Sequence, residues 1–274
     1  MSRLDARFAA LKKEGRAGFV PFITAGDPDP ETSFAILEKL PAAGADIIEL
    51  GMPFSDPMAD GPAVQASSTR ALKAGASMSR TLDMLRKFRK ADSKTPIVLM
   101  GYFNPIHAYG TARFSRDAAA AGADGLIVVD LPPEEDEVLR APAAAQGLDI
   151  IRLATPTSDD ARLGKILDGA SGFLYYVSIA GVTGTRTFDA AQVKAAIARI
   201  RKQSQLPVAV GFGIKTPDHA AAIAAIADAV VVGSAIVNQI GAKLGEPRER
   251  VVASVLELVK SLAESAHASR RETV

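Results

Sequence analysis

The chain has 274 residues, of which 48% are hydrophobic, and this is enough for one large domain with a single core. Its 32 Lys and Arg residues balance 31 Asp and Glu residues, so no basic stripe predicts nucleic-acid binding. The lack of cysteine excludes disulfides and thiolate metal sites, and the three histidines lack the spacing of metal ligands, so we expect no metal.

The amino-terminal segment MSRLDARFAALKKEG has helical periodicity and carries charges throughout, which predicts an amphipathic helix over about 3–14. It does not resemble the apolar core of a secretory signal, and no later run approaches the length of a membrane span. We therefore expect a cytoplasmic protein that does not bind membranes.

Eight short apolar runs follow along the chain, and each is succeeded by a polar loop and an alanine-rich helical stretch. Near-continuous runs of Val, Ile and Leu are typical of parallel strands that are covered on both faces. Eight such runs alternating with helices predict an α/β fold, the (β/α)8 or TIM barrel. The predicted strands are 18–24, 46–51, 96–102, 124–130, 148–155, 172–178, 206–213 and 228–234.

Helix starts between the strands support this alternation, because Asp29, Asp189 and Thr216 offer capping side chains. An open doubly wound sheet is the alternative. It would need a switch in strand order, which a sequence does not show, and no GxGxxG follows the first strand.

The end of the chain predicts a second amphipathic helix over about 248–264. We expect one barrel domain over 1–265, with extra helices at both ends, and a disordered tail over 266–274.

The second apolar run contains an acid, Glu49, between isoleucine and leucine neighbours. An unpaired buried charge is costly and tends either to neutralise or to find a partner. We therefore interpret Glu49 as an inward-facing acid/base, the alternative being a Glu in a surface salt bridge. The long loop that follows, PFSDPMADGP, carries Asp56 and Asp60 towards the carboxyl-terminal rim, where the active sites of barrels form.

Glycines close the seventh and eighth predicted strands, in Gly211-Phe212-Gly213 and Gly233-Ser234, and the second pair precedes the short helix AIVNQI. Backbone amides at a helix start, glycines and one hydroxyl suit a phosphate without any Lys or Arg. Gly184, in the long loop IAGVTGTRTF after the sixth strand, is a further candidate amide. The alternative is that these glycines only form tight turns.

Apolar side chains at the strand ends separate the acid from this phosphate site and suit a flat aromatic ligand. A register slip of one residue would turn Ile127 or Val129 outward. His107 lacks a visible orienting partner and is interpreted as a surface residue. The predicted inward residues are Phe22, Met100, Tyr102, Ile127, Val129, Leu153, Tyr175 and Phe212.

Six segments in this order resemble the family of tryptophan synthase α subunits over nearly the whole chain: ELGMPFSDPMADGP, GYFNP, VVDLPPEE, AGVTGT, GFGI and GSAIV. The first is highly specific for that family, whereas the last two fit several phosphate-binding barrels. The resemblance implies cleavage of indole-3-glycerol phosphate to indole and glyceraldehyde 3-phosphate. It also implies a pyridoxal-phosphate-bearing β subunit as partner, in an αββα complex, with no cofactor in this chain.

The resemblance implies roles for single residues. Glu49 and Asp60 match the two catalytic carboxylates of the family, and Tyr175 is expected to assist them. Ile179 stands where some members carry Arg, which bears on closure of the lid over the site. The matching substrate-binding positions are Phe22, Tyr102, Thr183, Gly184, Phe212, Gly213, Gly233 and Ser234, and the matching interface positions are Pro53, Asp56, Asn104 and Pro132.

Two other classes of function compete with this interpretation. A phosphosugar isomerase or an indole-glycerol-phosphate-forming lyase could use the same phosphate site, but the second would be expected to place a lysine at a strand end, and no predicted strand ends in Lys. A non-catalytic barrel would keep the partner surface alone, and retention of both carboxylates argues against it.

Overall fold

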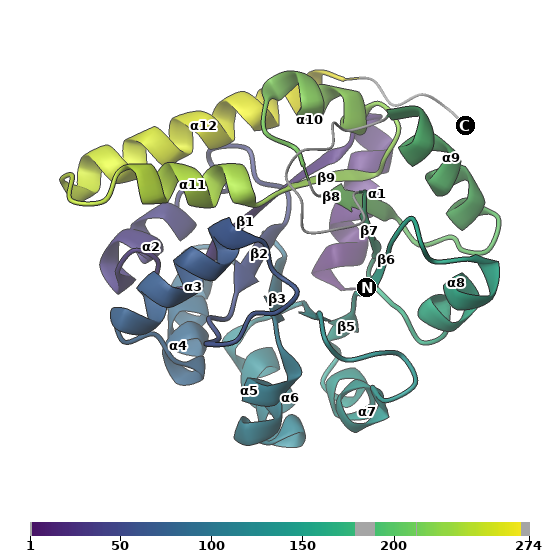
Figure 1. Ribbon diagram of the computed structural model, residues 1–274, viewed down its shortest axis with the longest axis horizontal. Helices are drawn as coiled ribbons and strands as arrows, with labels where there is room; N and C mark the ends of the chain where they lie inside the picture. The colour runs from purple at the N-terminus through teal and green to yellow at the C-terminus, as the bar shows by residue number, and fades with distance from the viewer. Residues whose placement is uncertain (1, 179–189, 212, 270–274) are drawn as a thin grey trace.

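The computed structural model describes residues 2–178, 190–211 and 213–269. Helices surround a ring of parallel strands, as Figure 1 shows. In the described residues the strands are β1 (Gly18–Thr24), β2 (Ile48–Gly51), β3 (Ile97–Gly101), β4 (Gly125–Val128), β5 (Asp149–Ile150), β6 (Arg152–Ala154), β7 (Leu174–Val177), β8 (Val208–Gly211) and β9 (Ala229–Val232). The helices are α1 (Arg3–Glu14), α2 (Pro30–Leu37), α3 (Pro62–Lys73), α4 (Met78–Arg89), α5 (Phe103–Tyr109), α6 (Thr111–Ala121), α7 (Glu137–Ala145), α8 (Asp160–Leu167), α9 (Ala190–Arg201), α10 (Pro217–Ala224), α11 (Ser234–Ala242) and α12 (Arg248–Ala268).

The strands are hydrogen-bonded in the order β5-β4-β3-β2-β1-β9-β8-β7-β6. The predicted fifth strand, 148–155, is divided at Ile151, so that β5 pairs with β4 and β6 pairs with β7. Ile151 itself donates its N–H to the carbonyl of Leu126 at 3.0 Å. One continuous segment thus touches both ends of the sheet and closes it, which confirms the predicted (β/α)8 barrel.

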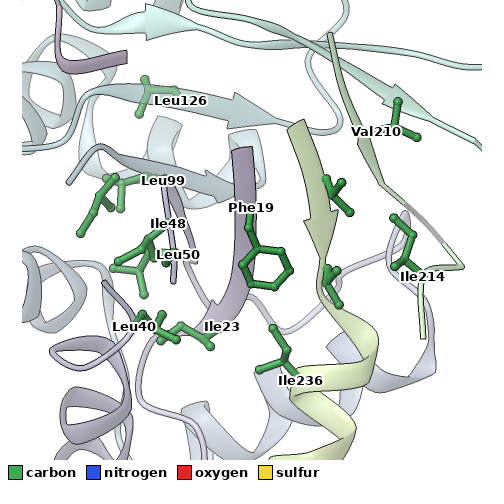
Figure 2. Packing of buried hydrophobic residues seen from close by; sticks show 14 of the residues in the cluster. Phe19, Ile23, Leu40, Ile48, Leu50, Leu99, Leu126, Val210, Ile214 and Ile236 are labelled. Atoms are coloured by element: carbon green, nitrogen blue, oxygen red, sulfur yellow. The ribbon is translucent and has the colours of Figure 1, made fainter. Parts of the chain in front are cut away.

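Side chains that alternate along the strands fill two separate layers. Phe19, Ile48 and Leu126 pack in the layer between the strands and the surrounding helices, where Figure 2 shows Phe19 with Ile236 of α11 close by. Residues of the opposite parity, such as Val20 and Ile127, fill the inside of the barrel. These side chains therefore occupy the inside of the barrel among the described residues.

Helix α1 closes the amino-terminal end of the barrel. Its apolar face, Leu4, Phe8 and Leu11, belongs to the inner cluster together with Val20 and Ile47. The helix spans the predicted 3–14 and begins at Ser2, whose side chain and Asp5 form a capping box. Since this end is plugged, the carboxyl-terminal rim is the open one.

Buried aspartates at the amino-terminal end tie neighbouring strands together. Asp46, just before β2, accepts a hydrogen bond from the N–H of Phe19 in β1 at 2.8 Å. Asp124, just before β4, holds the N–H of Ile97 in β3 at 2.7 Å in the same way. Each of these carboxylates is also paired with arginine, which offsets the cost of burying it. This end of the barrel is therefore built for stability.

The carboxyl-terminal helix is longer than predicted. Helix α12 runs to Ala268 instead of about 264, so the expected tail over 266–274 is helical at its start. The reason is tertiary, because Ala266 is fully buried and His267 lies 2.8 Å from the buried Asp46.

Two predicted helix starts are confirmed. Asp29 accepts a hydrogen bond from the N–H of Thr32 at the start of α2, and Thr216 accepts one from His219 at the start of α10. The third, Asp189, lies outside the described residues. Throughout the described ranges, each helix is too short or too polar to cross a lipid bilayer.

Candidate active site

Glu49 lies in β2 and faces the inside of the barrel, as predicted. The pairing of β2 places it opposite Phe22 of β1 and Val98 of β3. It is 4% exposed, and burial together with the negative charge of Asp60 raises the pKa of its carboxyl to about 8. Because the raised pKa lies above neutrality, Glu49 is mostly protonated at pH 7 and can donate a proton.

Asp60 lies in the loop that leads from β2 to α3, on the same side of the barrel. Its carboxylate is 3.0 Å from the hydroxyl of Tyr102. Burial raises the pKa of Asp60 to about 6, and the Tyr102 hydrogen bond partly opposes this rise. Asp60 therefore ionises before Glu49, and its charge makes the second ionisation harder, so the two carboxyl groups act as a coupled pair.

Tyr175 lies in β7 and completes the polar group. It pairs in register with Leu153 of β6 and Ala209 of β8. Its hydroxyl lies directly over Gly211, so closely that a Cβ atom at position 211 would overlap it. Burial, followed by the charges of Glu49 and Asp60, raises the pKa of Tyr175 well above its ordinary value. The hydroxyl is thus a neutral donor at any physiological pH.

A cavity of about 1350 Å³ opens at this rim and contains Glu49, Asp60 and Tyr175 in its wall. The inner cluster confirms the predicted register, with Ile127 inward and Leu126 outward. Tyr102 does not line the cavity; it lies beneath the loop with its hydroxyl on Asp60. The predicted apolar residues in the wall are Phe22, Met100, Ile127, Val129, Leu153 and Tyr175.

The predicted phosphate site lies in the same cavity, after β8 and β9. Gly213, Gly233 and Ser234 all line it, and Ser234 is the first residue of α11. The first amides of a helix have no partner within it and carry partial positive charge, which favours an anion. Gly213 has φ +78°, a conformation that L side chains rarely adopt.

The same wall contains further polar residues that the sequence interpretation did not name, among them Lys215 and Asn238. Asn238 lies one helical turn after Ser234, so the spacing of four residues was the available signal. Lys215 follows Gly213 by two residues, beyond the strand, where no pattern indicates the direction of a side chain.

The predicted interface residues all lie in segments that follow β2, β3 and β4. Pro53 and Asp56 lie in the loop after β2, Asn104 in α5 after β3, and Pro132 in the loop after β4. These three strands are neighbours in the sheet. Asp56, Asn104 and Pro132 are exposed, and so is Met58 in the Asp60 loop, at 79%.

Thr183, Gly184 and Phe212, as well as Ile179, lie outside the described residues. Within the part of the chain that the structure describes, no group of three or more His, Asp or Glu side chains could hold a metal ion.

Comparison with known proteins identifies the family of the chain. A sequence-family profile described as tryptophan synthase alpha chain matches residues 8–267. A structure of tryptophan synthase subunit alpha from Legionella pneumophila str. Paris is 41% identical, with a TM-score of 0.88, and the match covers 97% of this chain and 98% of that one. A structure of Mycobacterium tuberculosis tryptophan synthase is 35% identical, with a TM-score of 0.88, over 98% of this chain and 99% of that one. A chain from Aquifex aeolicus VF5 is 36% identical over 99% and 100% of the two chains, with a TM-score of 0.88. The chain therefore belongs to the tryptophan synthase alpha chain family.

Proposed function

We propose that Glu49 and Asp60 are the two catalytic acids of this chain and that Tyr175 assists them. As a member of its family, the chain is a carbon-carbon lyase of tryptophan biosynthesis, which cleaves indole-3-glycerol phosphate to indole and glyceraldehyde 3-phosphate. The observation that carries the residue assignment is a pair of carboxyl groups with pKa values of about 8 and about 6 in the wall of one largely apolar cavity. Near pH 7, such a pair presents one proton donor and one carboxylate.

The reaction needs one protonated and one ionised carboxyl group. Cleavage begins when the indole carbon that bears the side chain takes up a proton, which leaves positive charge on the ring and its N–H. Neutral Glu49 supplies this proton, and ionised Asp60 stabilises the charge. The bond to the glycerol chain then breaks and its electron pair returns to the ring. The Glu49 carboxylate accepts the proton of the adjacent hydroxyl, which becomes the aldehyde carbonyl, so Glu49 ends protonated as it began.

The remaining cavity wall supports the two ends of the substrate. The phosphate is assigned to the amides and hydroxyl at Gly213, Gly233 and Ser234. The family resemblance adds Gly184, which lies outside the described residues. The indole ring is assigned to the apolar wall that includes Phe22. The family resemblance adds Phe212, which lies outside the described residues. Tyr175, neutral and next to the acids, is assigned a hydrogen bond to the reacting glycerol chain.

An alpha chain of tryptophan synthase has a β subunit as its partner. We extend this to an αββα complex in the cytoplasm, in which pyridoxal phosphate belongs to the β subunit and this chain contributes no cofactor. The position of Pro53, Asp56, Asn104 and Pro132 after three neighbouring strands supports a single docking face.

Indole release from indole-3-glycerol phosphate by the purified chain tests the assignment. Glu49→Gln is expected to abolish release while substrate binding stays nearly intact, because the amide keeps the shape but cannot transfer the proton. Glu38→Gln, at an exposed position at the end of α2, is the matched control and should leave turnover unchanged. Substantial residual turnover in Glu49→Gln would remove Glu49 from the mechanism.

A further inference from the structure

The hydroxyl of Tyr102 makes two hydrogen bonds to the loop that carries the proposed catalytic carboxylate, Asp60. It lies 3.0 Å from the backbone N of Ala59 and 3.0 Å from Oδ2 of Asp60. The Ala59 N–H can only donate, so the hydroxyl accepts there and donates its own proton to the Asp60 carboxylate. The Tyr102 ring is 3% exposed and packs on Phe54 of the same loop, with ring centroids 5.4 Å apart.

Two residues that follow β4 form hydrogen bonds with the backbone on either side of Tyr102. The carbonyl of Gly101, on one side of it, accepts a hydrogen bond from Val129 at 3.0 Å. The N–H of Phe103, on the other side, donates to Oδ1 of Asp130 at 2.7 Å. Tyr102 precedes the first residue of α5 and makes no side-chain cap of its own, so Asp130 supplies the missing acceptor from a neighbouring strand end.

We infer that Tyr102 is a positioning residue for Asp60 and that Asp130 anchors Tyr102, so that the loop after β4 is coupled to the catalytic loop after β2. The inference rests on the proposed role of Asp60. Asp130 is exposed and lies two residues before Pro132, on the face assigned to the partner. A subunit that docks there meets the far end of a continuous chain of contacts that ends on the Asp60 carboxylate.

This arrangement also sets when Asp60 is charged. Burial raises its pKa, and the hydrogen bond from Tyr102 favours the ionised form and holds the pKa down, near 6. Loss of the hydroxyl should therefore raise the pKa of Asp60 and reduce the ionised fraction at pH 7.

Tyr102→Phe keeps the ring on Phe54 and removes only the hydroxyl. We expect kcat at pH 7 to fall about tenfold, as for loss of a hydrogen bond to a charged group, with KM little changed. The acid limb of the pH profile should move to higher pH. Tyr109→Phe is the matched control, because it removes a hydroxyl that lies 2.9 Å from Asp117 and outside the cavity wall, and it should change neither quantity.

Two variants of Asp130 test whether it anchors Tyr102. Asp130→Ala removes the acceptor for Phe103 and should reproduce part of the loss, whereas Asp130→Asn retains an oxygen acceptor and should restore most of it. In the double variant Tyr102→Phe with Asp130→Ala, kcat should fall no further than in Tyr102→Phe alone, since both changes act on one contact.

A readout without catalysis separates this inference from the proposed function. Titration of 13C-labelled aspartate by NMR, assigned with Asp60→Asn, should show the Asp60 pKa higher in Tyr102→Phe than in the wild type. An unchanged titration and kcat would overturn the positioning role, as would a rise in KM alone, which would make the hydroxyl a substrate contact. Full turnover in Asp60→Asn would instead overturn the proposed function and leave the titration result standing.

Discussion

Burial of Glu49 is expected to cost stability in a way that depends on pH. Its carboxyl has an ordinary pKa of 4.5, which rises to about 8 in the folded chain. The folded state therefore holds this proton more tightly than the unfolded state does. The cost of ionising Glu49 is absent below pH 4.5, grows as the pH rises, and is complete above about 8. Each pKa unit corresponds to about 1.4 kcal/mol, so the full cost approaches about 5 kcal/mol and the part between pH 5 and pH 8 is about 3 kcal/mol.

Glu49→Gln removes this titration and keeps the side-chain shape. The free energy of unfolding of the variant, relative to the wild type, should rise by about 3 kcal/mol between pH 5 and pH 8. Urea denaturation at pH 5, 6, 7 and 8 measures it, with Glu38→Gln as the exposed control. The comparison uses the change of the free energy of unfolding with pH, because the cost of burying the amide of the variant is the same at every pH and cancels. Parallel stability curves for Glu49→Gln and wild type would refute the reasoning, because they would mean that Glu49 titrates alike in both states.

Four other perturbations test the site. Turnover should rise with pH through about 6, as Asp60 ionises, and fall through about 8, as Glu49 loses its proton; a profile flat from pH 5 to pH 9 would contradict both assignments. Asp60→Asn should raise the barrier by roughly 3 kcal/mol, seen in kcat, and should move the alkaline limb to lower pH, because the charge that opposes ionisation of Glu49 is gone. Calorimetry should show that Gly213→Val and Gly233→Val weaken the binding of glycerol phosphate more than the binding of indole. The loss should be larger at Gly213, where φ is +78°, than at Gly233, where an added Cβ would only reach contact distance of Phe22. Equal losses for both ligands would indicate general misfolding. Titration with a cognate β subunit should stimulate indole release by the wild type and less so by Asp56→Lys, and equal stimulation of both would exclude Asp56 from the interface.

The pattern of apolar runs in the sequence was sufficient to predict the (β/α)8 barrel. The apolar runs from 18–24 to 228–234 are continuous because parallel strands in a barrel are covered on both faces, and this property survives in a single sequence. Glu49 could be found for the same reason, since a charge inside such a run violates the pattern that the core imposes. Gly213 and Gly233 could be found as candidates because each closes a predicted strand.

The tertiary structure decided everything that depends on contacts between distant segments. The strand break at Ile151 arises because one segment must pair with β4 on one side and β7 on the other. Helix α12 extends past 264 because His267 reaches Asp46, more than two hundred positions earlier. The hydrogen bond from Tyr102 to Asp60 could not be predicted, because strand alternation fixes the face of a residue and not the loop that folds over it. The pKa values of Glu49 and Asp60 likewise follow from burial and mutual proximity, which only the folded chain provides.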